Sequence, residues 1–209
     1  MKNKHIYSRI ISSIVMLFIG FYLVYEGSVL FNIFLIMCFI ISIYEWSKFK
    51  IEKIYKILGN VFLTFSFFSV YLFRSNYLGD GLFYVFLITI ICISSDIGGF
   101  SFGKIFKGPK ITKISPNKTY SGVFGAYILT IFFTYLFYLV QDKQNFFLNN
   151  LFSILVISTT SQVGDLIVSY FKRISKIKDT GNIIPGHGGI LDRIDGMIFA
   201  FPLAFLIYF

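Results

Sequence analysis

Charge is scarce in this chain of 209 residues. Only 14% of the residues are charged and 56% are hydrophobic, whereas soluble domains typically carry about 25% charged residues. This deficit argues against an ordinary soluble domain and favours an integral membrane protein. At roughly 20 residues per span, the length accommodates about seven transmembrane helices with short connections. We therefore expect an all-α, polytopic membrane bundle in one integral domain, residues 1–209.

Cysteine and the familiar nucleotide-binding loops are also lacking. The only cysteines, Cys38 and Cys92, each lie inside an apolar run, which favours small core residues over a metal site or a redox pair. Neither a G-x-x-x-x-G-K-[ST] loop nor a G-x-G-x-x-G turn occurs, so the phosphate-binding loops of soluble nucleotide enzymes are absent.

The apolar residues gather into stretches long enough for membrane spans: 9–25, 29–46, 54–73, 82–100, 122–140, 150–171 and 195–209. If the N-terminus is cytoplasmic, every Lys and Arg except Arg74 and Lys143 falls in a segment on the cytoplasmic side. The positive-inside rule then predicts seven spans, with the N-terminus inside and the C-terminus outside. We expect the first stretch to be a retained helix rather than a signal peptide.

The net charge of +9 is thus mainly a signal of membrane orientation, with attraction to anionic lipid headgroups as a second use. Its placement argues against nucleic acid as a partner. Two cytoplasmic loops, 100–121 and 172–194, combine Gly, Pro, Ser and Lys, a composition that stops helices and exposes backbone N–H groups. We expect residues 1–80 to form N-terminal helices and residues 81–209 to form the catalytic portion around these loops.

Asp165 is the most informative acidic residue. It lies about 10 Å into a predicted span from the cytoplasmic end, at 1.5 Å per residue. An unpartnered Asp at the centre of a span costs roughly 2.5–3.5 kcal/mol, so it should face the bundle interior or a wet cavity. Polar residues recur around it on one helix face, namely Ser158, Gln162, Ser169 and Lys172. Hydrogen bonding between helices is the alternative role for such residues.

A pair of carboxylates, Asp192 and Asp195, follows the second loop at a spacing of i, i+3. If the last helix begins near Asp192, both side chains share a face at its N-terminus. Mutual repulsion of the two would be relieved by a divalent cation, and hard oxygen ligands favour Mg²⁺. Helix capping by Asp192 with an ordinary salt bridge from Arg193 remains the alternative.

Both loops also carry groups suited to phosphate. The run "PGHGG" places glycines around His187, where backbone can approach a phosphate, although His187 could equally brace the loop. Lys172, Arg173 and Lys178 add cationic donors. In the other loop, Ser115, Lys118 and Thr119 precede a predicted helix start, a position that attracts anions. These features favour a membrane enzyme that transfers phosphoryl or nucleotidyl groups.

Residues 169–195 fit a longer signature, S-x-F-K-R-x4-K-D-x-G-x3-P-x-H-G-G-x2-D-R-x-D, at every fixed position. This run resembles the signature of phosphatidate cytidylyltransferases, also called CDP-diacylglycerol synthases. Asp96, "SPNKT" at 115–119 and "YEW" at 44–46 also look like family features. The chain departs from the pattern at Asn117 and Ser121, where many members carry Lys and Glu.

The resemblance implies conversion of CTP and phosphatidic acid into CDP-diacylglycerol and pyrophosphate at the bacterial inner membrane, with a homodimer as a plausible assembly. It implies Mg²⁺, one or two ions, held by Asp165, Asp179, Asp192 and Asp195; whether a monovalent cation accompanies them stays open. Catalytic roles would fall to Asp192, Asp195, Lys178 and His187. Substrate binding would fall to Ser115, Lys118, Thr119, Ser169, Lys172, Arg173 and Arg193.

Two other classes remain as alternatives. A CTP-dependent polyprenol kinase would transfer the γ-phosphate of CTP and release CDP. An ion-coupled transporter could use Asp165 as an intramembrane ion site, although transporters often show paired half-repeats, and no such duplication is visible. A CDP-alcohol phosphotransferase would require a D-G-x2-A-R-x8-G-x3-D-x3-D run, which is absent.

Overall fold

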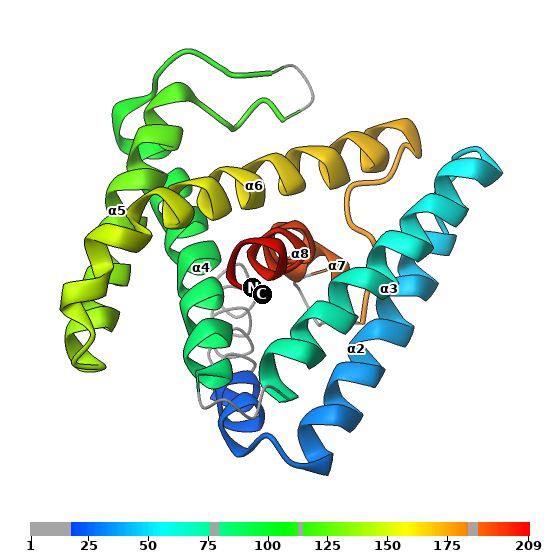
Figure 1. Ribbon diagram of the computed structural model, residues 1–209. Helices are drawn as coiled ribbons and strands as arrows, with labels where there is room; N and C mark the ends of the chain where they lie inside the picture. Colours follow the sequence, from blue (N-terminus) through cyan, green and yellow to red (C-terminus); the bar gives the residue numbers. More distant parts are fainter. Residues whose placement is uncertain (1–17, 76–79, 113–114, 184–187) are drawn as a thin grey trace, which may run out of the picture. The chain divides into compact units, whose positions relative to one another are not determined.

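The computed structural model describes residues 18–75, 80–112, 115–183 and 188–209 (Figure 1). Within these ranges the protein is helical and forms no strand, which confirms the all-α prediction. Residues 18–26 are helical, and the helices that follow are α2 (Val29–Ser47), α3 (Lys53–Ser75), α4 (Gly81–Phe106), α5 (Tyr120–Val140), α6 (Phe147–Ile174), α7 (Leu191–Ile194) and α8 (Met197–Tyr208), with a short 3₁₀ turn, Gln144–Phe146, before α6.

Five of the described helices, α2 to α6, are long and apolar enough to cross a membrane. Each of these helices coincides with one of the apolar stretches found in the sequence. Many of their large apolar side chains are exposed, as expected for helices whose outer faces contact lipid tails. The molecule is thus a multi-pass membrane protein. The start of the first predicted span, residues 9–17, lies outside the described residues.

The last apolar stretch, 195–209, forms one short helix. The helix α7 ends at Ile194, and the apolar helix α8, Met197–Tyr208, has only 12 residues. At 1.5 Å per residue, 12 residues rise about 18 Å, less than the roughly 30 Å of a hydrocarbon core. The Asp195 side chain accepts a hydrogen bond from the backbone N–H of Gly196 at 2.9 Å, a local bond that competes with helical pairing.

The chain divides into two compact units. The first comprises the described parts of Met1–Leu82 together with Phe171–Ile194, and the second comprises the described parts of Phe83–Tyr170 together with Asp195–Phe209. The described residues of 171–194 therefore pack with helices that are far from them in the sequence. Of the predicted site residues, the first unit contains Lys172, Arg173, Lys178, Asp179, Asp192 and Arg193, and the second contains Ser115, Lys118, Thr119, Asp165, Ser169 and Asp195.

In the first unit, α2 and α3 lie side by side (Figure 1). At the end of α2, the Trp46 ring is buried against Phe49 and Phe171, with ring centroids 4.9 and 5.1 Å apart. The backbone N–H of Lys50 donates to the hydroxyl of Ser175 at 3.0 Å. Through these contacts, the end of α2 and the connection to α3 pack against the last turn of α6 and against Ser175, which follows it.

In the second unit, α4, α5 and α6 share a buried line of hydroxyl groups. Thr130 on α5 lies 3.4 Å from the hydroxyl of Ser94 on α4 and 3.4 Å from that of Ser158 on α6. The Ser158 hydroxyl also donates to Ser95. Hydrogen bonds between helices of this kind are worth about 0.6–2 kcal/mol in membranes. Ser158 therefore takes the helix-bonding role that the sequence left open.

Candidate functional site

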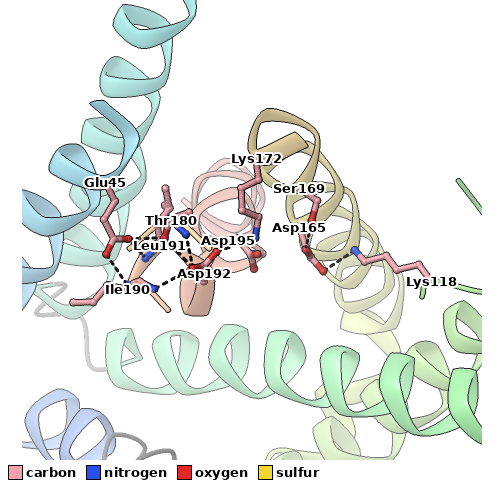
Figure 2. Close-up of polar contacts among 12 residues, drawn as sticks. Glu45, Lys118, Asp165, Ser169, Lys172, Thr180, Ile190, Leu191, Asp192 and Asp195 are labelled. Carbon is pink, nitrogen blue, oxygen red and sulfur yellow. Dashed lines mark hydrogen bonds and ion pairs between the residues drawn. The ribbon is translucent and has the colours of Figure 1, made fainter. Parts of the chain in front are cut away.

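In the first unit, residues from 172–183 and 188–194 gather around the carboxylate of Asp192. Lys172, in the last turn of α6, forms an ion pair with Asp192, with Nζ 2.9 Å from Oδ1. The other oxygen, Oδ2, accepts hydrogen bonds from the backbone N–H groups of Thr180 at 2.8 Å and Gly189 at 3.0 Å. Figure 2 shows Lys172 and Thr180 pointing toward Asp192 from separate parts of the chain.

These contacts change the acidity of Asp192. Burial alone would raise the pKa of its carboxyl group. The hydrogen bond from Lys172 and those from Gly189 and Thr180 act in the opposite direction, because they stabilise the carboxylate, and the pKa lies below its ordinary value. Asp192 is therefore ionised at neutral pH. Its carboxylate fixes the position of the ammonium group of Lys172, a residue that is only 9% exposed.

Sequence reasoning missed Glu45 as a member of this cluster. Its side chain, on α2, is 0% exposed and accepts three hydrogen bonds: from the Thr180 hydroxyl at 2.8 Å, the Leu191 N–H at 2.9 Å and the Ile190 N–H at 3.1 Å (Figure 2). The available signal was an acidic residue inside the apolar stretch 29–46. A carboxylate in such a setting is costly and implies a specific partner.

Two glycines allow the chain to fold this tightly. A Cβ atom on Gly189 would overlap the Thr180 hydroxyl and both carboxylate oxygens of Glu45. Gly188 has a φ of +86°, which side-chain-bearing residues rarely adopt, and a Cβ there would lie 2.7 Å from Asp192 Oδ2. The two glycines are therefore needed to let the backbone lie close to the carboxylates of Glu45 and Asp192. This structural role exists in addition to the phosphate contact that the sequence suggested.

The second unit contains another charged cluster, centred on Asp165. Its Oδ2 lies 2.6 Å from Lys118 Nζ, and its Oδ1 accepts a hydrogen bond from the Ser169 hydroxyl at 3.2 Å (Figure 2). Lys118 also donates to the backbone carbonyl of Gln162 at 3.3 Å. The structure thus brings together three residues that the sequence singled out. The side chains of Lys118 and Asp165 remain 25% and 28% exposed, so ligands can reach both.

The loop that carries Lys118 is folded back on itself. The N–H of Ile111 donates to the Lys118 carbonyl at 3.0 Å, and the N–H of Lys118 donates to the Ser115 carbonyl at 3.1 Å. Thr119 caps α5 by accepting the N–H of Gly122 on its hydroxyl at 3.2 Å. These bonds hold Lys118 toward α6, while substrate contacts by Ser115 and Thr119 stay a prediction.

The sequence predicted a shared helix face for the paired carboxylates if the last helix begins near Asp192, and that condition is not met, because α8 begins at Met197. Asp192 belongs to α7, which ends at Ile194, and Asp195 lies in the break before α8. Asp192 also belongs to the first unit, whereas Asp195 belongs to the second. In the turn between the two helices, the backbone N–H of Gly196 donates to the Asp195 side chain at 2.9 Å.

The remaining predicted residues fall into two groups. Arg173, Lys178, Asp179 and Arg193 are exposed on the first unit, where charged ligands can reach them. His187 lies outside the described residues.

The predicted metal site receives mixed support. In the described part of the chain, no three His, Cys, Asp or Glu side chains form a group that could hold an ion. The oxygen donors themselves fit Mg²⁺, and Asp165, Asp179 and Asp195 are all accessible. Both oxygens of Asp192 already accept hydrogen bonds. This carboxylate can therefore bind a metal ion only if the ammonium group of Lys172 moves away from it.

Comparison with known proteins places the chain in a family. A model described as "Cytidylyltransferase family" matches residues 53–209. The phosphatidate cytidylyltransferase of Rickettsia bellii is 34% identical over 99% of this chain and 92% of its own length. The Rickettsia typhi protein of the same name is 34% identical over 97% of this chain and 92% of its own length. The Bacillus subtilis protein of that name is 38% identical over 61% of this chain, a match that spans 48% of the Bacillus protein. The chain therefore belongs to the cytidylyltransferase family.

Proposed function

We propose that this protein is a phosphatidate cytidylyltransferase, which converts CTP and phosphatidic acid into CDP-diacylglycerol and pyrophosphate. The observation that carries the proposal is the identity of 34% with the Rickettsia bellii phosphatidate cytidylyltransferase over nearly the whole of both chains. The helices suit a substrate whose acyl tails stay in the membrane. Each of the two charged clusters, the one around Asp165 and the one around Asp192, carries a lysine suited to a phosphate group at the membrane surface.

The reaction needs no strong general base. A phosphate monoester has a second pKa near 6, so the lipid phosphate carries a nucleophilic oxygen at neutral pH. That oxygen forms a bond to the α-phosphorus of CTP, while the bond from this phosphorus to the oxygen bridging the α- and β-phosphates breaks. Pyrophosphate leaves with the electron pair of that bond. The protein must therefore mainly position the phosphates and neutralise their charge.

Basic side chains perform this neutralisation. Lys172 acts as a fixed cation, because Asp192 holds its ammonium group at 2.9 Å and little reorganisation is needed when phosphate arrives. Lys118 is oriented in the same way by Asp165. The proposed phosphate-binding cations are Lys118, Lys172, Arg173, Lys178 and Arg193, and the proposed hydrogen-bond donors are Ser115, Thr119, Ser169 and His187.

Mg²⁺ belongs to the same proposal. Its ligands would come from Asp165, Asp179 and Asp195, whose oxygens suit a hard cation. Asp192 would join them only in a state in which Lys172 has left it for a phosphate. When bound, the ion would supply positive charge to the pyrophosphate leaving group. Binding of Mn²⁺ to the purified protein, followed by electron paramagnetic resonance without substrates, tests the ligands separately from activity. Asp179→Asn should weaken that binding, whereas Asp80→Asn, outside both loops, should not.

The proposed placement follows the distribution of Lys and Arg. We place the N-terminus and the loops 100–121 and 172–194 on the cytoplasmic side of a bacterial inner membrane, with seven spans and the C-terminus outside. The short helix α8 would serve as the seventh span only where the bilayer thins locally around it. A homodimer is the proposed assembly. Accessibility of single cysteines introduced at Lys143 and Lys176 to a membrane-impermeant reagent tests the orientation, because only the first should react in intact cells.

The decisive experiment uses purified protein, phosphatidic acid, Mg²⁺ and CTP labelled at either the α- or the γ-phosphate. We expect the α-label to enter the lipid product and the γ-label to appear in pyrophosphate. A γ-label in the lipid with release of CDP would identify a lipid kinase instead. Absence of any labelled lipid from active, folded protein would contradict both activities.

A further inference from the structure

We infer that Glu45 is a positioning residue for nucleotidyl transfer, an inference that rests on the proposed function. It acts through Thr180, Ile190 and Leu191, whose positions it fixes beside Asp192 and Lys172. Glu45 lies on α2, before the residues 53–209 that the family model matches. The N-terminal helices would thus contribute directly to the organisation of the reactive segment, as well as anchoring the chain in the membrane.

The contacts of Glu45 explain why its carboxylate cannot easily be replaced. One oxygen, Oε1, accepts the N–H of Ile190, and the other, Oε2, accepts both the N–H of Leu191 and the hydroxyl of Thr180. Both oxygens must therefore be acceptors. An amide in the same place has one acceptor oxygen, and its NH₂ group would face an N–H donor on one side. Such a buried mismatch is expensive.

Thr180 connects Glu45 with Asp192. Its hydroxyl lies 2.8 Å from Glu45 Oε2 and 3.0 Å from Asp192 Oδ2. A hydroxyl carries one hydrogen, so Thr180 donates to only one of the two carboxylates at a time. The backbone N–H of Thr180 donates to Asp192 in addition. Displacement of Glu45 therefore changes the hydrogen bonds of Asp192, and through Asp192 it changes the position of Lys172.

A purely structural role for Glu45 predicts a different outcome from a positioning role. If Glu45 only stabilises the fold, its loss lowers the amount of folded protein but leaves the turnover number of each folded molecule intact. If Glu45 positions the reactive segment, the turnover number falls in molecules that remain folded. The two roles are separated by measuring kcat and KM for CTP together with thermal unfolding in detergent.

The test compares Glu45→Gln with Ser42→Ala in the full-length protein. Ser42 is a matched control, because it is also 0% exposed on α2, but its hydroxyl donates to the Cys38 carbonyl within the same helix. We expect Glu45→Gln to lower kcat about 10- to 100-fold, as is typical for groups that orient a reactive side chain, with KM for CTP changed by less than about threefold. Ser42→Ala should keep the wild-type kcat.

A second pair covers the case in which Glu45→Gln fails to fold. Thr180→Val keeps the shape but removes the hydroxyl, and it should lower kcat about 10-fold. Thr180→Ser restores the hydroxyl and should recover most of the loss. Folded Glu45→Gln or Thr180→Val protein with wild-type kcat would overturn the inference alone. Wild-type protein that forms no CDP-lipid would instead overturn the proposed function, and with it the role of Glu45 in that reaction.

Discussion

Lys118 and Asp165 form an ion pair of 2.6 Å that joins the loop before α5 to the polar face of α6. The sequence assigned these residues to different tasks, Lys118 to phosphate and Asp165 to a metal. In the structure each holds the other while both remain partly exposed. A ligand that takes up one partner must therefore compete for it with the other, which couples the two proposed tasks.

This pair predicts strongly non-additive substitutions. We expect Asp165→Asn and Lys118→Met each to lower kcat/KM about 100-fold, because each loses a charged group and also the orientation of its partner. The double substitution should be little worse than either single one. Steady-state kinetics on the four proteins provides the measurement. Losses that multiply in the double variant would mean that the two residues act independently.

Asp192→Asn should almost abolish CDP-lipid formation, with a loss of at least about 100-fold. The amide keeps the size of the side chain but removes the charge that holds Lys172 and puts an NH₂ group next to N–H donors. The protein should still insert into membranes, as followed by fractionation of membranes and by its yield after extraction in detergent. Full activity in this variant would exclude a role for the ion pair.

The acidity of Asp192 predicts how stability depends on pH. Its pKa in the folded protein lies below the ordinary value, so its contribution to stability is complete above the pKa of the unfolded chain, about 3.9. That contribution is lost as the pH falls through the folded pKa. As the pH falls below about 4, the free energy of unfolding should therefore decrease more steeply in the wild-type protein than in Asp192→Asn. Parallel curves would show that the hydrogen bonds to Asp192 contribute no net stability.

Gly189→Ala should destabilise the first unit at the point where Glu45 contacts Thr180. The added Cβ would overlap the atoms of both residues, and overpacking of this kind costs about 1–3 kcal/mol. We expect a lower unfolding temperature and a kcat reduced about 10-fold. Gly99→Ala is the matched control, because the nearest atom to its Cβ would be 4.0 Å away. Equal effects of the two substitutions would remove the special role of Gly189.

Part of the site was predictable because its signals are local. The sequence pointed to Asp165 and Ser169 on one helix face, and these side chains contact each other. It also selected Lys172 and Asp192, which form an ion pair. It did not predict the turn that separates α7 from α8 between Asp192 and Met197, because residue spacing does not encode where a short helix ends.

The sequence alone determined that the chain is helical and membrane-spanning, because long apolar stretches must satisfy their own backbone hydrogen bonds in lipid. Hydrophobicity is a property of each stretch and needs no knowledge of its neighbours. Only the tertiary structure decided that Glu45 reaches Thr180 and Leu191, and that Lys118 reaches Asp165. The choice of partner for a buried charge depends on which distant segments the fold brings within hydrogen-bonding distance, and no local pattern contains that information.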